Sequence, residues 1–91
     1  MEHEWDNNKK LSNQLKHGVD FYDAVKIFLD EERIEVIDDR KDYGENRYRT
    51  VGLVEGMLLT VVYTHRRHRC RIISARRASH YEKEAYYHQK Y

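Results

Sequence analysis

Arginine residues gather in one short segment of this sequence. The segment RRHRCRIISARR, residues 66–77, holds six arginines and no lysine. In a strand, alternate side chains point to opposite faces, so Arg69 and Arg71 are expected to share a face, about 7 Å apart. That spacing suits neighbouring phosphates of a nucleic-acid strand, and the planar guanidinium fork binds phosphate oxygens in a bidentate way. The segment therefore predicts an anion-binding surface, against the alternative of a solvated charged edge that blocks unwanted strand pairing.

Charge is distributed unevenly along the chain, although the formal net charge is only +1. Residues 1–46 contain 7 Lys and Arg against 13 Asp and Glu, whereas residues 47–91 contain 10 against 3. Eight of those ten basic residues are Arg. The asymmetry favours an anionic partner, either a nucleic acid or an acidic protein that covers the same surface. The alternative is that the two halves neutralise each other across the fold.

Histidine and cysteine residues offer other chemistry, but their spacing does not support it. His65, His68 and Cys70 form H-x-x-H-x-C, yet no second ligand pair completes a zinc site and the nearby arginines oppose a cation. We therefore expect no metal and no cofactor. His68 lies within the arginine segment and His80 lies shortly after it, and both are acid–base candidates because imidazole changes charge near neutral pH. Cys70 is expected to point away from the arginines.

Length and composition limit the class of protein. A chain of 91 residues has room for one small domain, so we treat residues 1–91 as a single unit. The nearly apolar run 57–63 is too short to span a bilayer, and the first ten residues contain no apolar signal region. One cysteine excludes an internal disulfide and fits a reducing compartment. These features predict a cytoplasmic protein that does not enter membranes.

The expected elements must position the arginines. Asp6 and Gly18 are typical caps of a helix over residues 7–17, whose apolar stripe would be Leu11 and Leu15. Asp20 would cap a second helix, in which Phe21, Ala24, Val25 and Phe28 recur at helical spacing. Strands are expected at 33–38, 47–53, 57–64 and 69–74, with Arg76 and Arg77 following where the chain leaves the sheet. Short turns between these strands predict an antiparallel meander with residues 57–64 at its centre.

A last helix is expected from Ser79 to about residue 90. Ser79 and Glu82 form a Ser-x-x-Glu capping box. Ala78, Tyr81 and Ala85 would face inward, whereas Tyr87 and Tyr91 are candidates for a partner interface. The complete expectation is an α+β domain, with a four-stranded antiparallel sheet, two N-terminal helices and one C-terminal helix.

Several short motifs, taken in order, resemble one known family. They are Trp5-Asp6, Asn8-Lys9, Asn13, Lys16-His17-Gly18-Val19, Phe21 and Ala24, then Gly44-Glu45-x-Arg47-Tyr48, Val61 to Thr64, and Arg69-x-Arg71 to Arg76 with Ala78 and Glu82. Together they resemble BrnT-type toxins over nearly the whole chain. The basic turn at 65–68 and the Tyr-rich tail depart from the pattern without touching a core motif. Such proteins are similar to the RelE superfamily of small ribonucleases and act as toxins of type II toxin–antitoxin pairs.

The resemblance implies metal-independent RNA cleavage by attack of a 2′-hydroxyl on the adjacent phosphorus. This reaction needs a base, an acid and cations on the phosphoryl oxygens. Arg71 and Arg76 are expected to stabilise the phosphate, and the resemblance leaves the proton carriers open among Lys9, Lys16, His17, Glu82 and Tyr63. The catalytic candidates are thus Arg71, Arg76, Lys16, His17 and Glu82. The candidates for RNA binding are Arg66, Arg67, Arg69, Arg77, His68 and Tyr63.

The resemblance also implies a protein partner. A BrnA-type antitoxin would neutralise the toxin in a hetero-oligomer that binds operator DNA through the antitoxin. Bare arginines would repel one another, so the antitoxin is expected to cover them with acidic and apolar side chains. It is also expected to bury aromatics such as Tyr63 or the tyrosines of the last helix. The competing interpretation is a non-catalytic nucleic-acid-binding regulator that uses the same arginine surface, because both functions need arginine.

Overall fold

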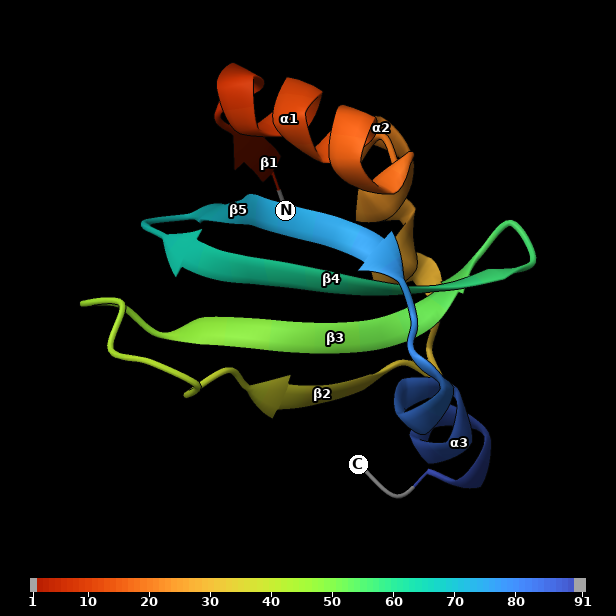
Figure 1. Ribbon diagram of the computed structural model, residues 1–91. Coiled ribbons are helices and arrows are strands. Elements are labelled where there is room, and N and C mark those ends of the chain that lie inside the picture. The colour runs from red at the N-terminus through yellow and green to blue at the C-terminus, as the bar shows by residue number, and fades with distance from the viewer. Residues whose placement is uncertain (1, 90–91) are drawn as a thin grey trace.

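The computed structural model describes residues 2–89 as an α+β fold (Figure 1). The chain begins with strand β1 and helix α1, continues through a short helix α2 and a 3₁₀ helix η1, forms four further strands, and ends in helix α3. Their bounds are β1 Glu2–Trp5, α1 Asn7–His17, α2 Phe21–Ala24, η1 Val25–Leu29, β2 Ile34–Ile37, β3 Arg47–Val54, β4 Met57–Arg66, β5 Arg69–Arg77 and α3 His80–His88.

The five strands form one mixed sheet in the order β1-β5-β4-β3-β2. Strands β2 to β5 are the expected antiparallel meander, and β4 lies at its centre. The expectation of a four-stranded, wholly antiparallel sheet is wrong, because β1 adds a fifth strand parallel to β5. The sequence EHEW does not resemble a strand, since acidic residues are disfavoured there. It pairs because Glu2 and Glu4 lie opposite Arg69 and Arg71, and opposite charges stabilise cross-strand pairs.

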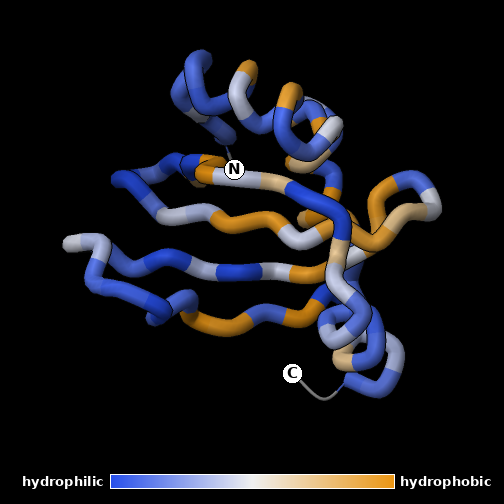
Figure 2. Tube along the Cα trace, in the orientation of Figure 1, coloured by the Kyte–Doolittle hydropathy of each residue, from blue (hydrophilic) through white to orange (hydrophobic). Residues whose placement is uncertain are grey.

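The core lies mainly on the face of the sheet that α2 and η1 cover. Phe21, Ala24 and Ile27 are fully buried against Leu59 and Val61 of β4. The apolar part of β4 passes through the middle of the sheet, as Figure 2 shows. The buried residues 21, 24 and 27 repeat every three positions, the period of a 3₁₀ helix. This explains why the expected second α-helix ends after one turn and continues as η1.

Helix α1 is capped as predicted but packs differently. The Asp6 carboxylate accepts from the backbone N–H groups of Asn8 and Lys9, and Gly18 adopts a left-handed φ of 69°. Its inward residue is Asn13, whereas Leu11 and Leu15 are exposed, which contradicts the expected apolar stripe. The Asn13 amide donates to Val19 O at 3.0 Å and Ala75 O at 2.7 Å, and accepts from Ala75 N at 3.1 Å. Polar anchoring to the backbone of β5 thus replaces apolar packing.

Helix α3 packs on the other face of the sheet, at one end. Its capping box is present as predicted, with Ser79 and Glu82 bonded to each other's backbone N–H. Ala85 is buried as expected, but Tyr81 is exposed and Tyr86 takes the inward position. The Tyr86 hydroxyl donates to Asp30 Oδ2 at 2.7 Å, which satisfies this phenol inside the fold. Tyr87 and Tyr91 were the candidates for a partner interface. Tyr87 is exposed, as a residue of such an interface must be, and Tyr91 lies outside the described residues.

Candidate nucleic-acid interface

A β-bulge in β5 decides which arginines share a face. Ile72 pairs with Tyr63 and Ser74 with Val62, so Ile73 is left without a partner position. An extra residue in one strand shifts the alternation of side chains by one. Cys70, Ile72 and Ala75 are consequently all buried on the face that α2 and η1 cover. The opposite face carries Arg69 and Arg71 before the bulge, and Ser74 and Arg76 after it, and we name it the arginine face.

Strand β5 differs from the sequence-based prediction in where it ends and in where it places Arg77. The strand was expected to end at Ser74, whereas β5 continues to Arg77. Simple alternation from Arg71 would place Arg77, not Arg76, on its face. The bulge reverses this choice, and Arg77 instead lines a separate pocket with Lys83 and Tyr87 near the β3–β4 turn. Arg77 is therefore not part of the arginine face.

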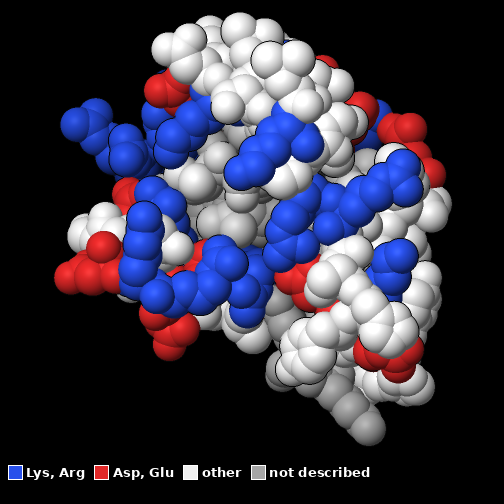
Figure 3. Space-filling view, viewed as in Figure 1, with Lys and Arg blue, Asp and Glu red and all other residues white. Residues whose placement is uncertain are grey.

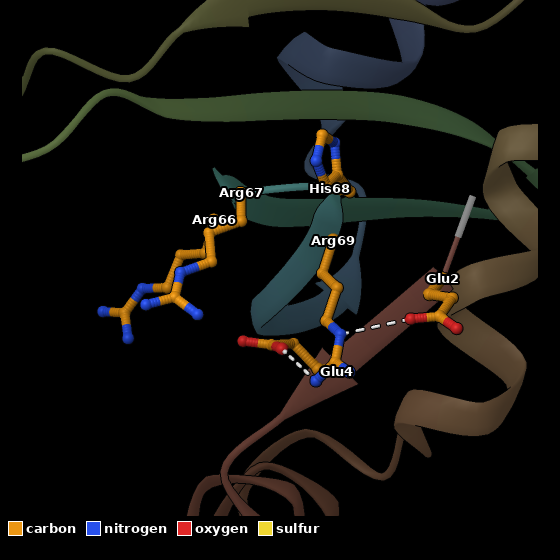
Figure 4. A pocket seen from close by; sticks show the side chains of 6 residues that line it. All are labelled: Glu2, Glu4, Arg66, Arg67, His68 and Arg69. Atoms are coloured by element: carbon orange, nitrogen blue, oxygen red, sulfur yellow. Dashed lines mark hydrogen bonds and ion pairs between the residues drawn. The ribbon is translucent and has the colours of Figure 1, made fainter.

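At one end of the arginine face, edge strand β1 supplies carboxylates to two arginines. Arg69 Nε donates to Glu2 Oε2 at 3.1 Å and Arg69 Nη1 donates to Glu4 Oε1 at 3.4 Å. Arg71 Nη1 donates to Glu4 Oε2 at 2.9 Å, and the hydrogen bond from Arg71 lowers the pKa of the Glu4 carboxyl. Figure 4 shows Arg69 reaching toward both glutamates. The sequence had suggested that these arginines repel one another. In the free protein they do not, because acidic residues of the N-terminal half neutralise them.

The β4–β5 hairpin extends this end of the face. Arg66, Arg67, His68 and Arg69 line a pocket of about 620 Å³ together with Glu2 and Glu4 (Figure 4). Arg67 takes a left-handed φ of 58° at the turn, and all four residues are exposed. The hairpin therefore offers guanidinium groups to solvent where a polyanion could reach them.

At the other end, Arg76 is held by a buried carboxylate. Arg76 Nη1 and Nη2 donate to Glu82 Oε1 and Oε2 at 2.7 and 2.9 Å. The Ser79 backbone N–H and Thr60 Oγ1 also donate to Glu82 Oε1, at 2.8 and 2.9 Å. Burial opposes ionisation of Glu82, but the hydrogen bonds from Arg76, Ser79 and Thr60 outweigh it and hold the pKa at about 2. Glu82 is thus an ionised anchor, and so low a pKa makes it a weak base.

Strand β3 adds arginines that the sequence analysis missed. Arg47 pairs with Thr64 and Arg49 with Val62 in the ladder, which places both on the arginine face. Arg47 and Arg66 both donate to the Glu45 carboxylate, at 3.2 and 3.4 Å. The alternation Arg47-Tyr48-Arg49 was the signal that could have revealed them. Figure 3 shows Lys and Arg side chains around a hollow over the sheet, between α1 and α3.

Helix α1 borders the same face with basic residues. Lys9, Lys16 and His17 line a pocket of about 220 Å³ with Ser12, Asn13, Ile73 and Ser74. Lys9 and Lys16 are exposed and His17 is half-buried. The structure therefore brings the candidates Lys16 and His17 to the side of β5 that also carries Arg71 and Arg76.

Tyr63 is not part of the arginine face. Its ring is 4% exposed and packs in the core among Phe28 and Tyr48. Its hydroxyl donates to Glu35 Oε1 at 2.5 Å, and burial together with this carboxylate raises the phenol pKa. The structure leaves Tyr63 without an exposed surface for the predicted contacts with RNA or an antitoxin, because residues 59, 61 and 63 of β4 all face the helices α2 and η1.

Other candidate groups lie outside the arginine face or are inert. Cys70 is buried as expected on the opposite face, and burial raises the pKa of its thiol to about 11. His80 is exposed at the start of α3, near Glu84. Within residues 2–89, no group of His, Cys, Asp and Glu side chains is arranged to hold a metal ion.

A small α+β protein with guanidinium groups ordered along one sheet face has the geometry of a polyanion-binding protein. The comparison with known families identifies the class further. The model of the family described as the ribonuclease toxin BrnT of type II toxin–antitoxin systems matches residues 5–82. This chain therefore belongs to the BrnT family of ribonuclease toxins, as its motifs indicated. No individual curated protein matches the chain.

In the described part of the chain, no helix is long and apolar enough to cross a membrane.

Proposed function

We propose that residues 1–91 act as one toxin domain that cleaves RNA without a metal ion and thereby inhibits translation in the cytoplasm. The observation that carries this proposal is the joint placement, in a chain of the BrnT family, of Arg71 and Arg76 on one face of β5 with Lys16 and His17 along its border. Guanidinium groups fixed before the substrate arrives stabilise developing charge without reorganisation.

The reaction is an internal transfer at phosphorus. The 2′-oxygen attacks the adjacent phosphorus while its proton passes to a base, and the bond to the 5′-oxygen breaks as an acid protonates that oxygen. The products are a 2′,3′-cyclic phosphate and a 5′-hydroxyl. Arg71 and Arg76 neutralise the phosphoryl oxygens, and Glu82 keeps Arg76 in place through its bidentate contact. Because Glu82 stays ionised and fully bonded, the proton-transfer roles belong to Lys16 and His17.

The RNA strand is held by the hairpin end of the face. Arg66, Arg67, Arg69 and His68 bind its backbone around the pocket beside β1. Incoming phosphates replace Glu2 and Glu4 as partners of the arginines, because each phosphodiester offers the same bidentate geometry and one RNA strand brings several of these charges together.

A BrnA-type antitoxin is the expected protein partner. It covers the arginine face with acidic and apolar side chains and carries the operator-binding part of a hetero-oligomer. Charge complementarity gives this association a fast, salt-sensitive on-rate.

Expression of the chain alone tests the proposal. We expect growth arrest, relieved by Arg71→Ala but not by Arg77→Ala, which removes an arginine from the same strand on the opposite face. Purified protein should cleave single-stranded RNA in the presence of EDTA, and Arg71→Ala should slow cleavage about 100-fold at unchanged fold. Salt-dependent RNA binding without any cleavage would instead support the competing function, a nucleic-acid-binding regulator.

A further inference from the structure

We propose that the groove between α1 and β5 binds one nucleotide of the RNA, next to the phosphate at Arg71 and Arg76. In this subsite Lys9 and Lys16 contact the backbone phosphate, and Ile73 packs against the base. The inference rests on the proposed function, and it gives α1 a role in binding the substrate.

The two lysines differ from the arginines in having no acidic partner. Every arginine of β5 on the arginine face is bonded to a glutamate, whereas Lys9 and Lys16 contact no carboxylate among residues 2–89. They lie seven residues apart on α1, which is about two turns, so both point to the same side of the helix. Lys10, on another side of α1, is close to Asp20 at 3.6 Å. Free ammonium groups therefore gather only on the side of α1 that faces the groove.

The bulge residue gives the groove an apolar wall. Ile73 has no partner position in the β4–β5 ladder, and it lines the groove opposite α1 while remaining partly exposed. Bulges redirect side chains in this way beside functional sites. A partly exposed isoleucine offers a flat apolar contact for a base. Ser12 and Ser74 lie on either side, and their hydroxyls have no hydrogen-bond partner within the described residues. They can bond to the edge of a base or to a ribose.

The groove is formed before any ligand binds. The Asn13 amide bridges α1 to the backbone of Ala75 through two hydrogen bonds, and a third holds Val19 O. This buried contact fixes the separation of helix and strand. The resulting pocket of about 220 Å³ is smaller than the roughly 300–1,000 Å³ of sites for whole small molecules. It has room for a single base.

The groove continues the arginine face without interruption. Ser74 lies between Arg71 and Arg76 along β5 and shares their face. A nucleotide in the groove therefore stands beside the phosphate that these arginines hold. Lys16 and His17, the two proton-transfer candidates, line the same groove, so Lys16 also contacts the phosphate of the bound nucleotide.

An uncleavable ligand tests the subsite separately from catalysis. The probe is a fluorescent, single-stranded hexanucleotide of mixed sequence with 2′-O-methyl groups, titrated by anisotropy at several salt concentrations. Lys9→Gln with Lys16→Gln should weaken binding at least tenfold at low salt. It should also reduce the slope of log K against log salt by about 1.4, since each lost phosphate contact on a single strand accounts for about 0.7. Ile73→Ser should weaken binding with an unchanged slope, because it removes an apolar contact and no charge.

Lys10→Gln is the matched control on the same helix, and it should leave both affinity and slope unchanged. If the lysine pair changes nothing while Arg69→Gln with Arg71→Gln reduces the slope, the subsite is wrong and the proposed function stands. If neither pair alters binding and wild-type protein does not cleave RNA, the proposed function fails as well. If the lysine pair weakens association with the antitoxin but not with the RNA probe, the groove is a protein-docking surface and the inference is overturned.

Discussion

The two ends of β5 present arginines on the same face, but the carboxylates that hold them differ in kind. Glu82, the partner of Arg76, is 5% exposed and accepts from Arg76, Ser79 and Thr60. Glu2 and Glu4, the partners of Arg69 and Arg71, belong to a four-residue edge strand in contact with solvent. A buried network has no water to replace a lost partner, whereas an exposed pair exchanges partners readily. Arg76 is therefore a fixed group, and Arg69, which with Glu2 is largely exposed, is free to change partners. Arg71 is intermediate, because its side chain and that of Glu4 are each only about a quarter exposed.

This difference suits two tasks in one site. Stabilising charge at a reacting phosphorus needs a cation that does not move. Holding a strand of RNA needs cations that bind phosphates one after another and release them. The carboxylates of β1 keep the arginines beside them ordered while no RNA is bound. When RNA binds, its phosphates replace these carboxylates as partners of the arginines.

The largest expected effect follows from removing the fixed arginine. Arg76→Ala leaves the buried Glu82 carboxylate without its bidentate partner, and breaking such a pair costs about 3 kcal/mol of unfolding free energy. Cleavage should fall by roughly 10²- to 10³-fold, as when one charge-stabilising donor is removed. Urea denaturation and single-turnover cleavage measure the two quantities.

A second variant separates the loss of stability from the loss of activity. In Arg76→Ala combined with Glu82→Gln, the buried charge is gone, so a substantial part of the stability should return while cleavage stays low. Recovery of cleavage in this double variant would show that Arg76 has only a structural role.

The same comparison predicts a dependence on pH at the buried end. The folded-state pKa of Glu82, about 2, lies below its ordinary value of 4.5. The group therefore contributes stability above pH 4.5 that is lost as the pH falls toward 2, on the order of 3 kcal/mol in total. Unfolding free energies of wild type and Glu82→Gln at pH 7, 5 and 3 measure it. Their difference should shrink on acidification, and a difference constant with pH would contradict the assignment.

Much of the fold could be predicted because its signals are local. Caps at Asp6, Gly18 and Ser79 depend on neighbours within a few residues, and the structure contains all three. The antiparallel order of the meander follows from short turns, and the central place of β4 from its apolar residues. The family was readable from ordered motifs, and the match over residues 5–82 confirms it.

The features that were missed depend on contacts distant in sequence. Strand β1 depends on contacts with distant residues, because its glutamates bind Arg69 and Arg71, which lie more than sixty residues away. The inward position of Asn13 depends on the backbone of Ala75, 62 residues along the chain. The bulge at Ile73 decides between Arg76 and Arg77, and no residue type marks it. The roles of the candidate residues stay predictions, and the sequence could not show that Arg77 and Tyr63 lie off the arginine face, because strand geometry determines where their side chains point.

The smallest expected effect concerns the exchangeable end, where Glu4→Gln removes a charge and keeps an amide oxygen that accepts from Arg71. If the Glu4 carboxylate competes with phosphate, the variant should bind the uncleavable hexanucleotide about threefold more tightly at low salt, the scale of an exposed ion pair. The gain should disappear at high salt, where such interactions are screened. Glu84→Gln removes the same charge from α3, where the Glu84 carboxylate lies within 4 Å of His80 and His88 and forms no ion pair with an arginine among the described residues, and it is the matched control. Weaker binding by Glu4→Gln would mean that the carboxylate positions Arg71 for the substrate, so that both ends of β5 are fixed and the contrast between them is only one of burial.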